Sequence, residues 1–370
     1  MRSLVRIHPR APLFAGLLAL ATLVFYGLAL SRQPIGPDEA RVISAAQQLP
    51  GAASVLINTG DRWLQPLHVY ATSVAHAIVP GFFAGRWASV AIAAINVGLL
   101  FLVAWRLFGG YLAAIAAAAV LVLTPAHMYF GRQGIDAISI IPFVLLWLYA
   151  LLEFLDNDRP AAIALAAAAL GAGVYTTTAA PLTMAFLFLT MIVVLWSAGR
   201  RKMSTVVTAV TAFGVMLVPL AVWFALNPQT YLDTYGSWAI HPAHIRNPID
   251  LVLANINRNT LGTRASAYWG LLDPSFLFFS TGEGRAPLHW ATAPLIILGV
   301  YHCVTRRSPA SILVLAATFV APIAGAGFGQ PHYVANALAL LPFLALLAGY
   351  GVHFIRQLIS GPPPRTDEEH

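Results

Sequence analysis

The chain has 370 residues, of which 59% are hydrophobic and only 9% are charged. Since globular domains carry about 25% charged residues, this composition argues against a water-soluble enzyme and excludes a disordered protein or a coiled coil. It predicts an all-α polytopic membrane protein. In such a protein the net charge of +7 reports on membrane topology and does not indicate nucleic-acid binding. The single cysteine, Cys303, excludes an intramolecular disulfide and is expected to be a small buried residue.

About ten segments approach the roughly 20 mostly apolar residues that a membrane-spanning helix needs. The first, 11–30, follows Arg2, Arg6 and Arg10 and is longer than the apolar core of a signal peptide. We therefore expect a retained first helix with a cytoplasmic N-terminus. The other predicted spans are 84–106, 110–128, 137–155, 160–178, 182–198, 204–226, 289–304, 309–328 and 333–355.

One further apolar segment, 66–79, contains His68 and His76. It is too short to cross a bilayer, and two imidazoles are poor lipid-facing groups, so we expect a re-entrant or interfacial helix. With ten spans both termini are cytoplasmic. The basic connections 199–202 and 305–307 then lie inside, in agreement with the positive-inside rule.

This topology predicts one membrane domain over 1–356 and a cytoplasmic, disordered tail over 357–370. The outer loops of that domain are predicted at about 31–83, 129–136 and 227–288, and the inner connections are short. Chemistry is therefore expected on the outer face.

Two acidic residues follow Pro37 at the start of the first outer loop. Acidic residues favour a helix N-terminus, so a helix is expected over 38–49. On it, Asp38 and Arg41 share one face and can pair. These residues alone leave two interpretations open, a capped interfacial helix with an ion pair or a functional carboxylate.

A second acidic candidate, Asp136, follows the third predicted span, with Arg132 four residues before it. A carboxylate at the mouth of a helix bundle is costly unless it is hydrated, paired or functional. A structural Arg132–Asp136 ion pair and a functional site remain equally open. His241 and His244 in the large outer loop are only a weak indication of a metal site, because two histidines do not complete a ligand set.

Together these motifs resemble the GT-C membrane glycosyltransferases, in the branch of the protein O-mannosyltransferases and aminoarabinose transferases (glycosyltransferase families 39 and 83). The residues that carry the resemblance are Asp38-Glu39 with Arg41, the proline-led segment 65–70, the segment 106–109, Thr124-Pro125 with Arg132 and Asp136, the segment 276–278 with Glu283, and His332-Tyr333. They run in order over essentially the whole chain.

The sequence departs from the family pattern at three places. His332 stands where the family has an arginine, and Asp61-Arg62-Trp63 stands where a lysine often precedes the juxtamembrane helix. A soluble C-terminal domain, which many members have, is not expected here.

The resemblance implies a GT-C fold and inverting transfer of a sugar, a hexose or a pentose, from a polyprenyl-phosphate donor to an acceptor hydroxyl on the periplasmic or extracellular side. It implies Asp38 as the base, with Glu39 and Asp136 orienting it or the acceptor. A divalent cation, Mg²⁺ or Mn²⁺ rather than Zn²⁺, would be held by Asp38, Glu39, Asp136 and Glu283. The residues expected to bind the donor phosphate or substrate are Arg41, Arg132, Arg264, Arg285, His332 and Tyr333.

The partners implied are the lipid bilayer, the polyprenyl-phosphate sugar and an acceptor that is a protein, a lipid or a glycan, without nucleic acid. The expected location is the inner (plasma) membrane, crossed several times. The alternative is a non-catalytic transporter or lipid-binding protein on the same scaffold. Transporters place polar residues near the middle of the bilayer, whereas here they cluster in outer loops, which favours the enzyme.

Overall fold

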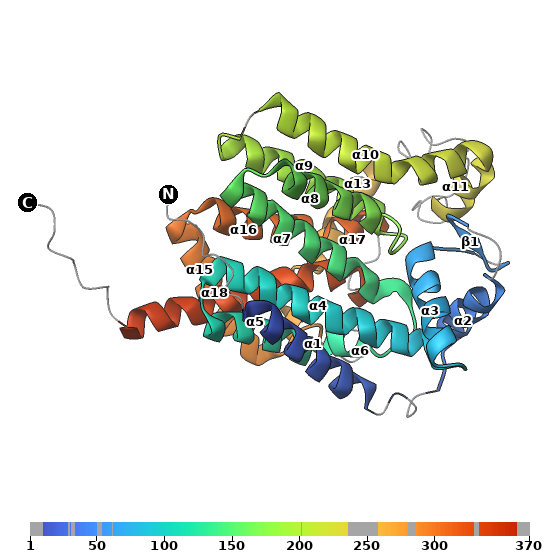
Figure 1. Ribbon diagram of the computed structural model, residues 1–370, viewed down its shortest axis with the longest axis horizontal. Coiled ribbons are helices and arrows are strands. Elements are labelled where there is room, and N and C mark those ends of the chain that lie inside the picture. The colour runs from blue at the N-terminus through green and yellow to red at the C-terminus, as the bar shows by residue number, and fades with distance from the viewer. Residues whose placement is uncertain are drawn as a thin grey trace, which may run out of the picture.

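A computed structural model of the chain describes residues 10–28, 30, 34–49, 54–60, 62–200, 202–235, 258–279, 286–328 and 333–360. Nearly all of the described chain is helical, and the long helices run side by side in a bundle (Figure 1). The exception is a small antiparallel hairpin of β1 (Ile57–Asn58) and β2 (Trp63–Leu64), in which Ile57 lies opposite Leu64. The predicted all-α class is confirmed.

The helices before residue 200 are α1 (Ala11–Gly27), α2 (Pro37–Gln48), α3 (Pro66–Ile78), α4 (Ala84–Phe108), α5 (Tyr111–Leu123), α6 (Pro125–Phe130), the 3-10 helix η2 (Asp136–Ile140), α7 (Ile141–Asn157), α8 (Pro160–Gly173) and α9 (Ala180–Ser197). Those after it are α10 (Met203–Leu226), α11 (Pro228–Tyr235), α13 (Arg258–Gly270), α14 (Pro274–Phe278), η4 (Trp290–Thr292), α15 (Ala293–Arg306), α16 (Pro309–Val320), α17 (Ile323–Phe328), η5 (Val334–Leu340) and α18 (Leu341–Ser360). Because α18 continues to Ser360, helix extends past the expected domain end at 356.

Six helical segments of the described chain are long and apolar enough to cross a membrane. They are Ala84–Phe108, Asp136–Asn157, Ala180–Ser197, Met203–Leu226, Pro309–Gly327 and Val334–Ser360. Three shorter apolar helices, α1, α5 and α8, and the helix α15 occupy the other predicted spans. The segment that was expected to be interfacial forms α3, which has only 13 residues.

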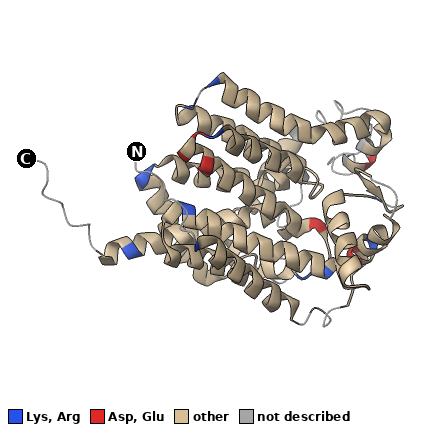
Figure 2. Cartoon of the chain, viewed as in Figure 1, with Lys and Arg blue, Asp and Glu red and all other residues tan. Residues whose placement is uncertain are grey.

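The charged residues of the described chain gather toward the two ends of the bundle, with a mostly uncharged belt between them (Figure 2). We call one end the hairpin end, because it carries α2, α3, β1–β2 and α11, and the other the opposite end (Figure 1). At the opposite end, Arg106 pairs with Asp156 at 2.8 Å, and Asp158 pairs with Arg200 and Lys202 at 3.1 Å. This separation of charge suits a protein that spans a bilayer, since charges within lipid are costly.

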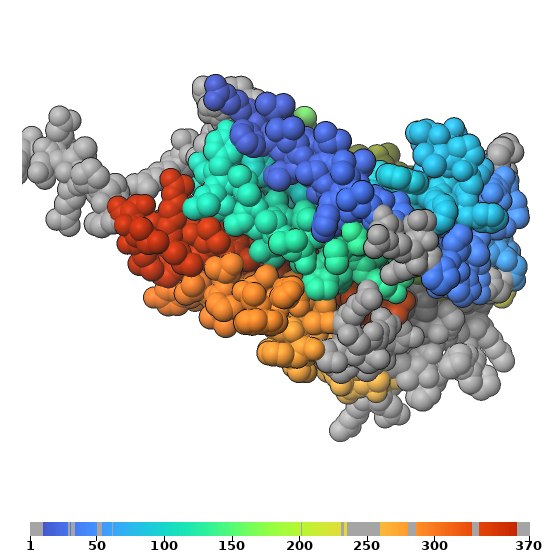
Figure 3. Space-filling view, turned by 90° about the horizontal axis from the view of Figure 1, so that it is seen from below, coloured from blue at the N-terminus to red at the C-terminus, as the bar shows by residue number. Residues whose placement is uncertain are grey.

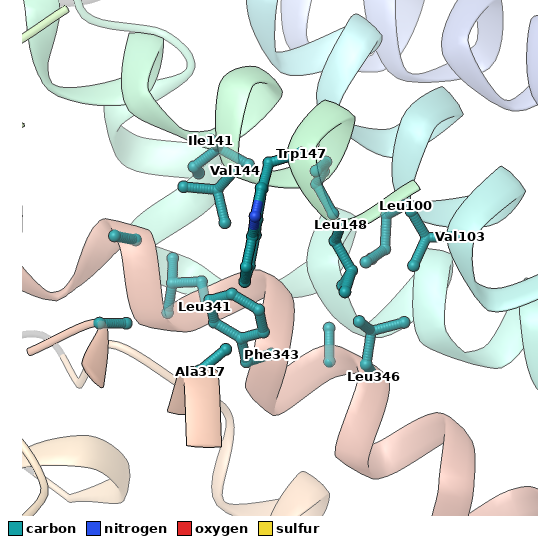
Figure 4. Close-up of a cluster of buried hydrophobic side chains, with 14 of the residues drawn as sticks. Leu100, Val103, Ile141, Val144, Trp147, Leu148, Ala317, Leu341, Phe343 and Leu346 are labelled. Carbon is teal, nitrogen blue, oxygen red and sulfur yellow. The ribbon is translucent and has the colours of Figure 1, made fainter. Parts of the chain in front are cut away.

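The core lies where α4, α7, α16 and α18 meet (Figure 4). Trp147 of α7 is fully buried and points toward Phe343 of α18, with Val144 and Leu148 of its own helix on either side (Figure 4). On one face, α1 lies lengthwise along the bundle, where it packs against α4, and α2 and α3 are gathered beyond it at the hairpin end (Figure 3). Cys303 is buried, as expected. By contrast, α10 exposes most of its apolar side chains at the edge of the bundle and suits contact with lipid.

The helices α15 and α18 approach each other closely at two glycines. In a bilayer lipid tails provide no hydrophobic force between helices, so helices associate by tight packing, which small residues allow. A Cβ atom added to Gly299 of α15 would collide with the carbonyl oxygen of Leu347, and one added to Gly351 of α18 would collide with that of Leu295. Backbone atoms cannot move aside as a flexible side chain can. The two glycines therefore set the distance between α15 and α18.

We expect Gly299→Ala to lower the thermal unfolding temperature of the purified protein in detergent, through overpacking that costs at least about 1–3 kcal/mol. The matched control is Gly214→Ala in α10, where a new Cβ meets nothing within 4 Å. That variant should unfold at or slightly above the wild-type temperature, since alanine favours helix over glycine. Equal unfolding temperatures of the two variants would show that α15 and α18 do not pack this closely.

Candidate functional site

A cavity of about 340 Å³ opens at the hairpin end. It is lined by residues of α2, β2 and α3 and by residues of η2, the start of α9 and η5. It brings together three residues predicted from distant parts of the sequence, namely Asp38, Asp136 and Tyr333. The other polar residues that line it are Arg62, Gln65, His68, Thr177, Thr178, Thr183 and Asn336.

Asp38 lies in the first turn of α2, where the N-terminal end of a helix favours an acidic residue. Its Oδ1 accepts hydrogen bonds from Arg41 Nη1 and from Arg62 Nη2, each at 2.6 Å. The first of these is the ion pair expected from the sequence. The side chain of Asp38 remains 54% exposed, so a molecule arriving from outside can reach the carboxylate.

Arg62 was not among the predicted site residues, although it lines the cavity. It is held by a tight turn in which the backbone N–H and the hydroxyl of Thr59 both donate to its carbonyl, at 3.0 and 2.9 Å. Gly60 provides the positive φ of that turn. The sequence did contain a sign that Arg62 belongs to the site. It stands shortly before the proline that starts α3, where the family that this chain resembles often has a lysine.

Asp136 is the first residue of η2 and also faces the cavity. Its expected partner, Arg132, does not pair with it. Arg132 Nη2 donates to the carbonyl of Phe25 at 3.0 Å, and the guanidinium lies 5.5 Å from the ring centroids of Phe25 and Tyr26. Residues four apart share a face only within a continuous helix. Here the backbone is extended at Ile135, which sends the two side chains in different directions.

Glu39 lies beside Asp38 in sequence but is buried away from the cavity lining. Its Oε1 accepts from Arg86 Nε at 2.9 Å and from the amide of Gly134 at 2.8 Å. Its Oε2 accepts from Arg86 Nη2 at 2.7 Å and from the amide of Gly36 at 3.0 Å. Since both oxygens are engaged, Glu39 is a positioning residue.

The electrostatics of Glu39 follow from this burial and these bonds. Burial alone would raise the pKa of the carboxyl group. The hydrogen bonds from Arg86, Gly134 and Gly36, together with the charge of Arg86, outweigh burial and hold the pKa below its ordinary value. Arg86 in turn donates to the carbonyls of Leu30 at 2.6 Å and Pro34 at 2.9 Å.

The remaining predicted residues divide into two groups. Arg264 in α13 donates from Nη1 to the carbonyls of Ala326 and Gly327 at 2.7 and 2.6 Å, so it caps the C-terminal end of α17, where carbonyls lack helical partners. Arg41 is engaged with Asp38. Glu283, Arg285, His332, His241 and His244 lie outside the described residues.

Glu283, the fourth ligand of the predicted cation site, lies outside the described residues, and no group of three or more His, Cys, Asp or Glu side chains among the described residues is placed to hold a metal ion. Glu39 has both oxygens bound to Arg86 and backbone amides, and Asp38 shares Oδ1 with two guanidiniums. Divalent cations need several carboxylate or carbonyl oxygens turned toward one point, which these paired groups do not offer.

We expect Glu39→Gln to lower the thermal unfolding temperature at pH 7, since breaking a buried pair costs about 3–5 kcal/mol. The wild-type contribution should be present above the ordinary pKa of glutamate and should disappear as the pH falls through the lower pKa of the folded state. The difference in unfolding temperature between the wild type and Glu39→Gln should therefore become smaller in acid. Unfolding curves at several pH values check this, with exposed Asp233→Asn as the matched control. A difference in unfolding temperature that grows in acid would contradict the stabilising role of the ionised Glu39.

Comparisons with known proteins show what the chain is similar to. Residues 62–225 match the family model described as dolichyl-phosphate-mannose-protein mannosyltransferase, and no curated protein matches the chain in sequence. The structure of ArnT from Cupriavidus metallidurans bound to undecaprenyl phosphate matches with a TM-score of 0.62 at 16% identity, over 94% of this chain and 62% of that chain. The apo structure of the same protein gives a TM-score of 0.61 at 16% identity, with the same coverage.

A more distant match is the oligosaccharyltransferase of Archaeoglobus fulgidus in complex with Zn and sulfate, with a TM-score of 0.50 at 13% identity, over 95% of this chain and 51% of that chain. At these identities the matches show a shared fold, and this chain spans only 62% of the length of ArnT. The resemblance expected from the sequence is confirmed at the level of the fold: the chain shares its fold with ArnT, and residues 62–225 match the mannosyltransferase family model.

Proposed function

We propose that the protein is an integral-membrane glycosyltransferase that moves a sugar from a polyprenyl-phosphate donor to an acceptor hydroxyl at the hairpin end. The observation that carries this proposal is the single cavity that gathers two carboxylates, Asp38 and Asp136, around the guanidinium of Arg62. Two findings support a lipid-phosphate donor. ArnT has been seen with undecaprenyl phosphate, and the matching family model is that of a dolichyl-phosphate-mannose-dependent transferase.

In the proposed reaction Asp38 acts as the base. Inverting transfer needs a carboxylate within hydrogen-bond distance of the acceptor hydroxyl, on the side of the sugar opposite the leaving group. As the acceptor oxygen bonds to the anomeric carbon, its proton passes to Asp38 and the bond from that carbon to the phosphate oxygen breaks. Arg41 and Arg62 hold Asp38 in one orientation through Oδ1. Asp136 positions the acceptor.

Arg62 stabilises the leaving group. The bond from the sugar to phosphate breaks with its electrons on the phosphate, and a guanidinium offers planar, charge-assisted hydrogen bonds to such an oxyanion. Arg62 lines the cavity and its side chain is 45% exposed. Val69, Ile135 and Ile140 give the cavity apolar walls against which the start of the prenyl chain can lie.

We further propose that the hairpin end faces the periplasm or the cell exterior and that both termini are cytoplasmic. The opposite end, where the described chain begins and ends, carries the larger share of positive charge, as cytoplasmic loops do (Figures 1 and 2). The basic residues of that end are Arg10, Arg106, Arg159, Arg200, Lys202, Arg306, Arg307 and Arg356. The protein is then a multi-pass protein of the plasma membrane, with one membrane domain.

We expect Asp38→Asn to reduce sugar transfer about 10²–10⁴-fold, because an amide keeps the shape of the carboxylate and cannot take the proton. Asp136→Asn should raise the KM for the acceptor more than it lowers kcat. The assay offers purified protein a panel of undecaprenyl-phosphate sugars and follows glycosylated product and released undecaprenyl phosphate, with and without EDTA. Asp233→Asn, an exposed acid outside the cavity, is the matched control.

Full transfer by Asp38→Asn at wild-type protein levels would exclude Asp38 as the base. Lipid binding with no transfer to any acceptor offered would instead favour the alternative, a lipid-binding protein on the same scaffold.

For Arg62→Gln we expect a loss of about 10²–10³-fold in kcat, the effect of removing one group that stabilises developing negative charge. Arg159→Gln, at the opposite end and 72% exposed, should transfer sugar at the wild-type rate. A change in KM for the donor with kcat intact would mean that Arg62 binds the donor without acting on the leaving phosphate.

A further inference from the structure

The cavity carries a second group of polar atoms that the proposed reaction does not use. His68 Nε2, Thr183 Oγ1 and Asn336 Nδ2 are buried and have no hydrogen-bond partner among the described residues. All three residues line the same cavity, from α3, α9 and η5. We call them the neutral trio.

Such atoms indicate a ligand because an unpaired buried donor or acceptor costs about 1–3 kcal/mol. Thr72 in α3 and Asn96 in α4 also have an unpaired buried atom, but neither lines the cavity. Three such atoms around one cavity are satisfied together only when hydroxyl groups of a ligand, or ordered water in its absence, fill the space.

The neutral trio differs in charge from the rest of the cavity. Asp38, Arg62 and Asp136 bring all its formal charges, from α2, the hairpin and η2. His68 is fully buried, and burial lowers the pKa of its imidazole to about 4, so the ring is neutral at pH 7. Its Nδ1 lies 3.1 Å from Ser139 Oγ, whereas its buried Nε2 has no such partner among the described residues. A neutral imidazole, a hydroxyl and an amide suit sugar hydroxyls and offer no counter-charge to an ion.

We propose that His68, Thr183 and Asn336 form the subsite for the sugar ring of the donor, and that this sugar is uncharged. The assignment rests on the proposed function, and it adds the class of sugar. The donor phosphate lies by Arg62 and the sugar hydroxyls meet the neutral trio. An amino sugar would bring an ammonium group to these three neutral side chains, which offer it no counter-charge as it is desolvated.

The test measures binding to the purified protein in detergent of bare undecaprenyl phosphate, of undecaprenyl phosphate carrying mannose, glucose, galactose or arabinose, and of the same lipid carrying a 4-amino sugar. We expect at least one uncharged sugar lipid to bind more tightly than bare undecaprenyl phosphate. The amino-sugar lipid should bind no more tightly than the bare lipid. Two variants test the subsite, Thr183→Val, which keeps the shape of the side chain, and Asn336→Leu. Each should reduce the affinity for the sugar lipid, relative to that for the bare lipid, about tenfold, the effect of one lost hydrogen bond of about 1.4 kcal/mol.

The controls separate this assignment from folding and from the proposed function. Thr72→Val also removes an unpaired buried hydroxyl, but outside the cavity, and should leave every affinity unchanged. Thr183→Val and Thr72→Val should unfold at or above the wild-type temperature, since each loses an unsatisfied buried group. Both should bind bare undecaprenyl phosphate as the wild type does.

Two results would overturn the subsite while leaving the proposed function standing. One is tightest binding of the amino-sugar lipid. The other is an unchanged preference for the sugar lipid in both Thr183→Val and Asn336→Leu, with the bare lipid still bound. If the wild type binds none of these lipids, the proposed function fails and the assignment fails with it.

Discussion

The buried ion pair of Glu39 and Arg86 is the interaction on which the geometry of the cavity depends. It joins α2 to α4, and its outer hydrogen bonds reach the segment after α1 and the turn at Gly134. Four N–H groups converge on one carboxylate, and the guanidinium also donates to two carbonyls. Burying two charges is favourable only when their hydrogen bonds are satisfied in this way.

This pair places both acidic residues of the cavity. Asp38 is the neighbour of Glu39 on α2, and Asp136 follows two residues after Gly134, whose amide is bound to Glu39. Holding Glu39 therefore holds both carboxylates at the cavity. The exposed ion pairs of Asp38 contribute little to stability, because water screens them. Their effect is to orient the Asp38 carboxylate and to keep Arg62 at the cavity wall.

Some of the described arginines stabilise the fold and one lines the cavity, and their charge alone does not distinguish the two roles. Arg264 binds the end of α17, Arg132 lies against the aromatic rings of α1, and Arg86 is buried with Glu39. Of the described arginines, only Arg62 lines the cavity. A guanidinium has five donors, so it serves equally well to close a helix end or to bind a phosphate, and the difference lies in what surrounds it.

Several features of the site followed from local rules of sequence. Hydrophobic stretches separated by charge predicted the helices, the short length of 66–79 predicted a helix too short to cross a bilayer, and the acidic first turn predicted α2 with its Asp38–Arg41 pair. These predictions hold because helix formation, capping and contacts three residues apart are decided within a few residues of chain. The same rules identified Asp38 and Asp136 as unusual carboxylates, and both line the cavity.

The partners of each charged group were decided only by the tertiary structure. Glu39 and Asp38 are adjacent and chemically similar, yet one is buried against Arg86 and the other faces the cavity, because α4 packs on one side of α2 alone. The neutral trio comes from three helices far apart in the chain, and no spacing rule connects His68, Thr183 and Asn336. The sequence determined which segments become helices and where acids stand at their ends. Burial and pairing arise from long-range packing, and they decided which of those polar groups form the site.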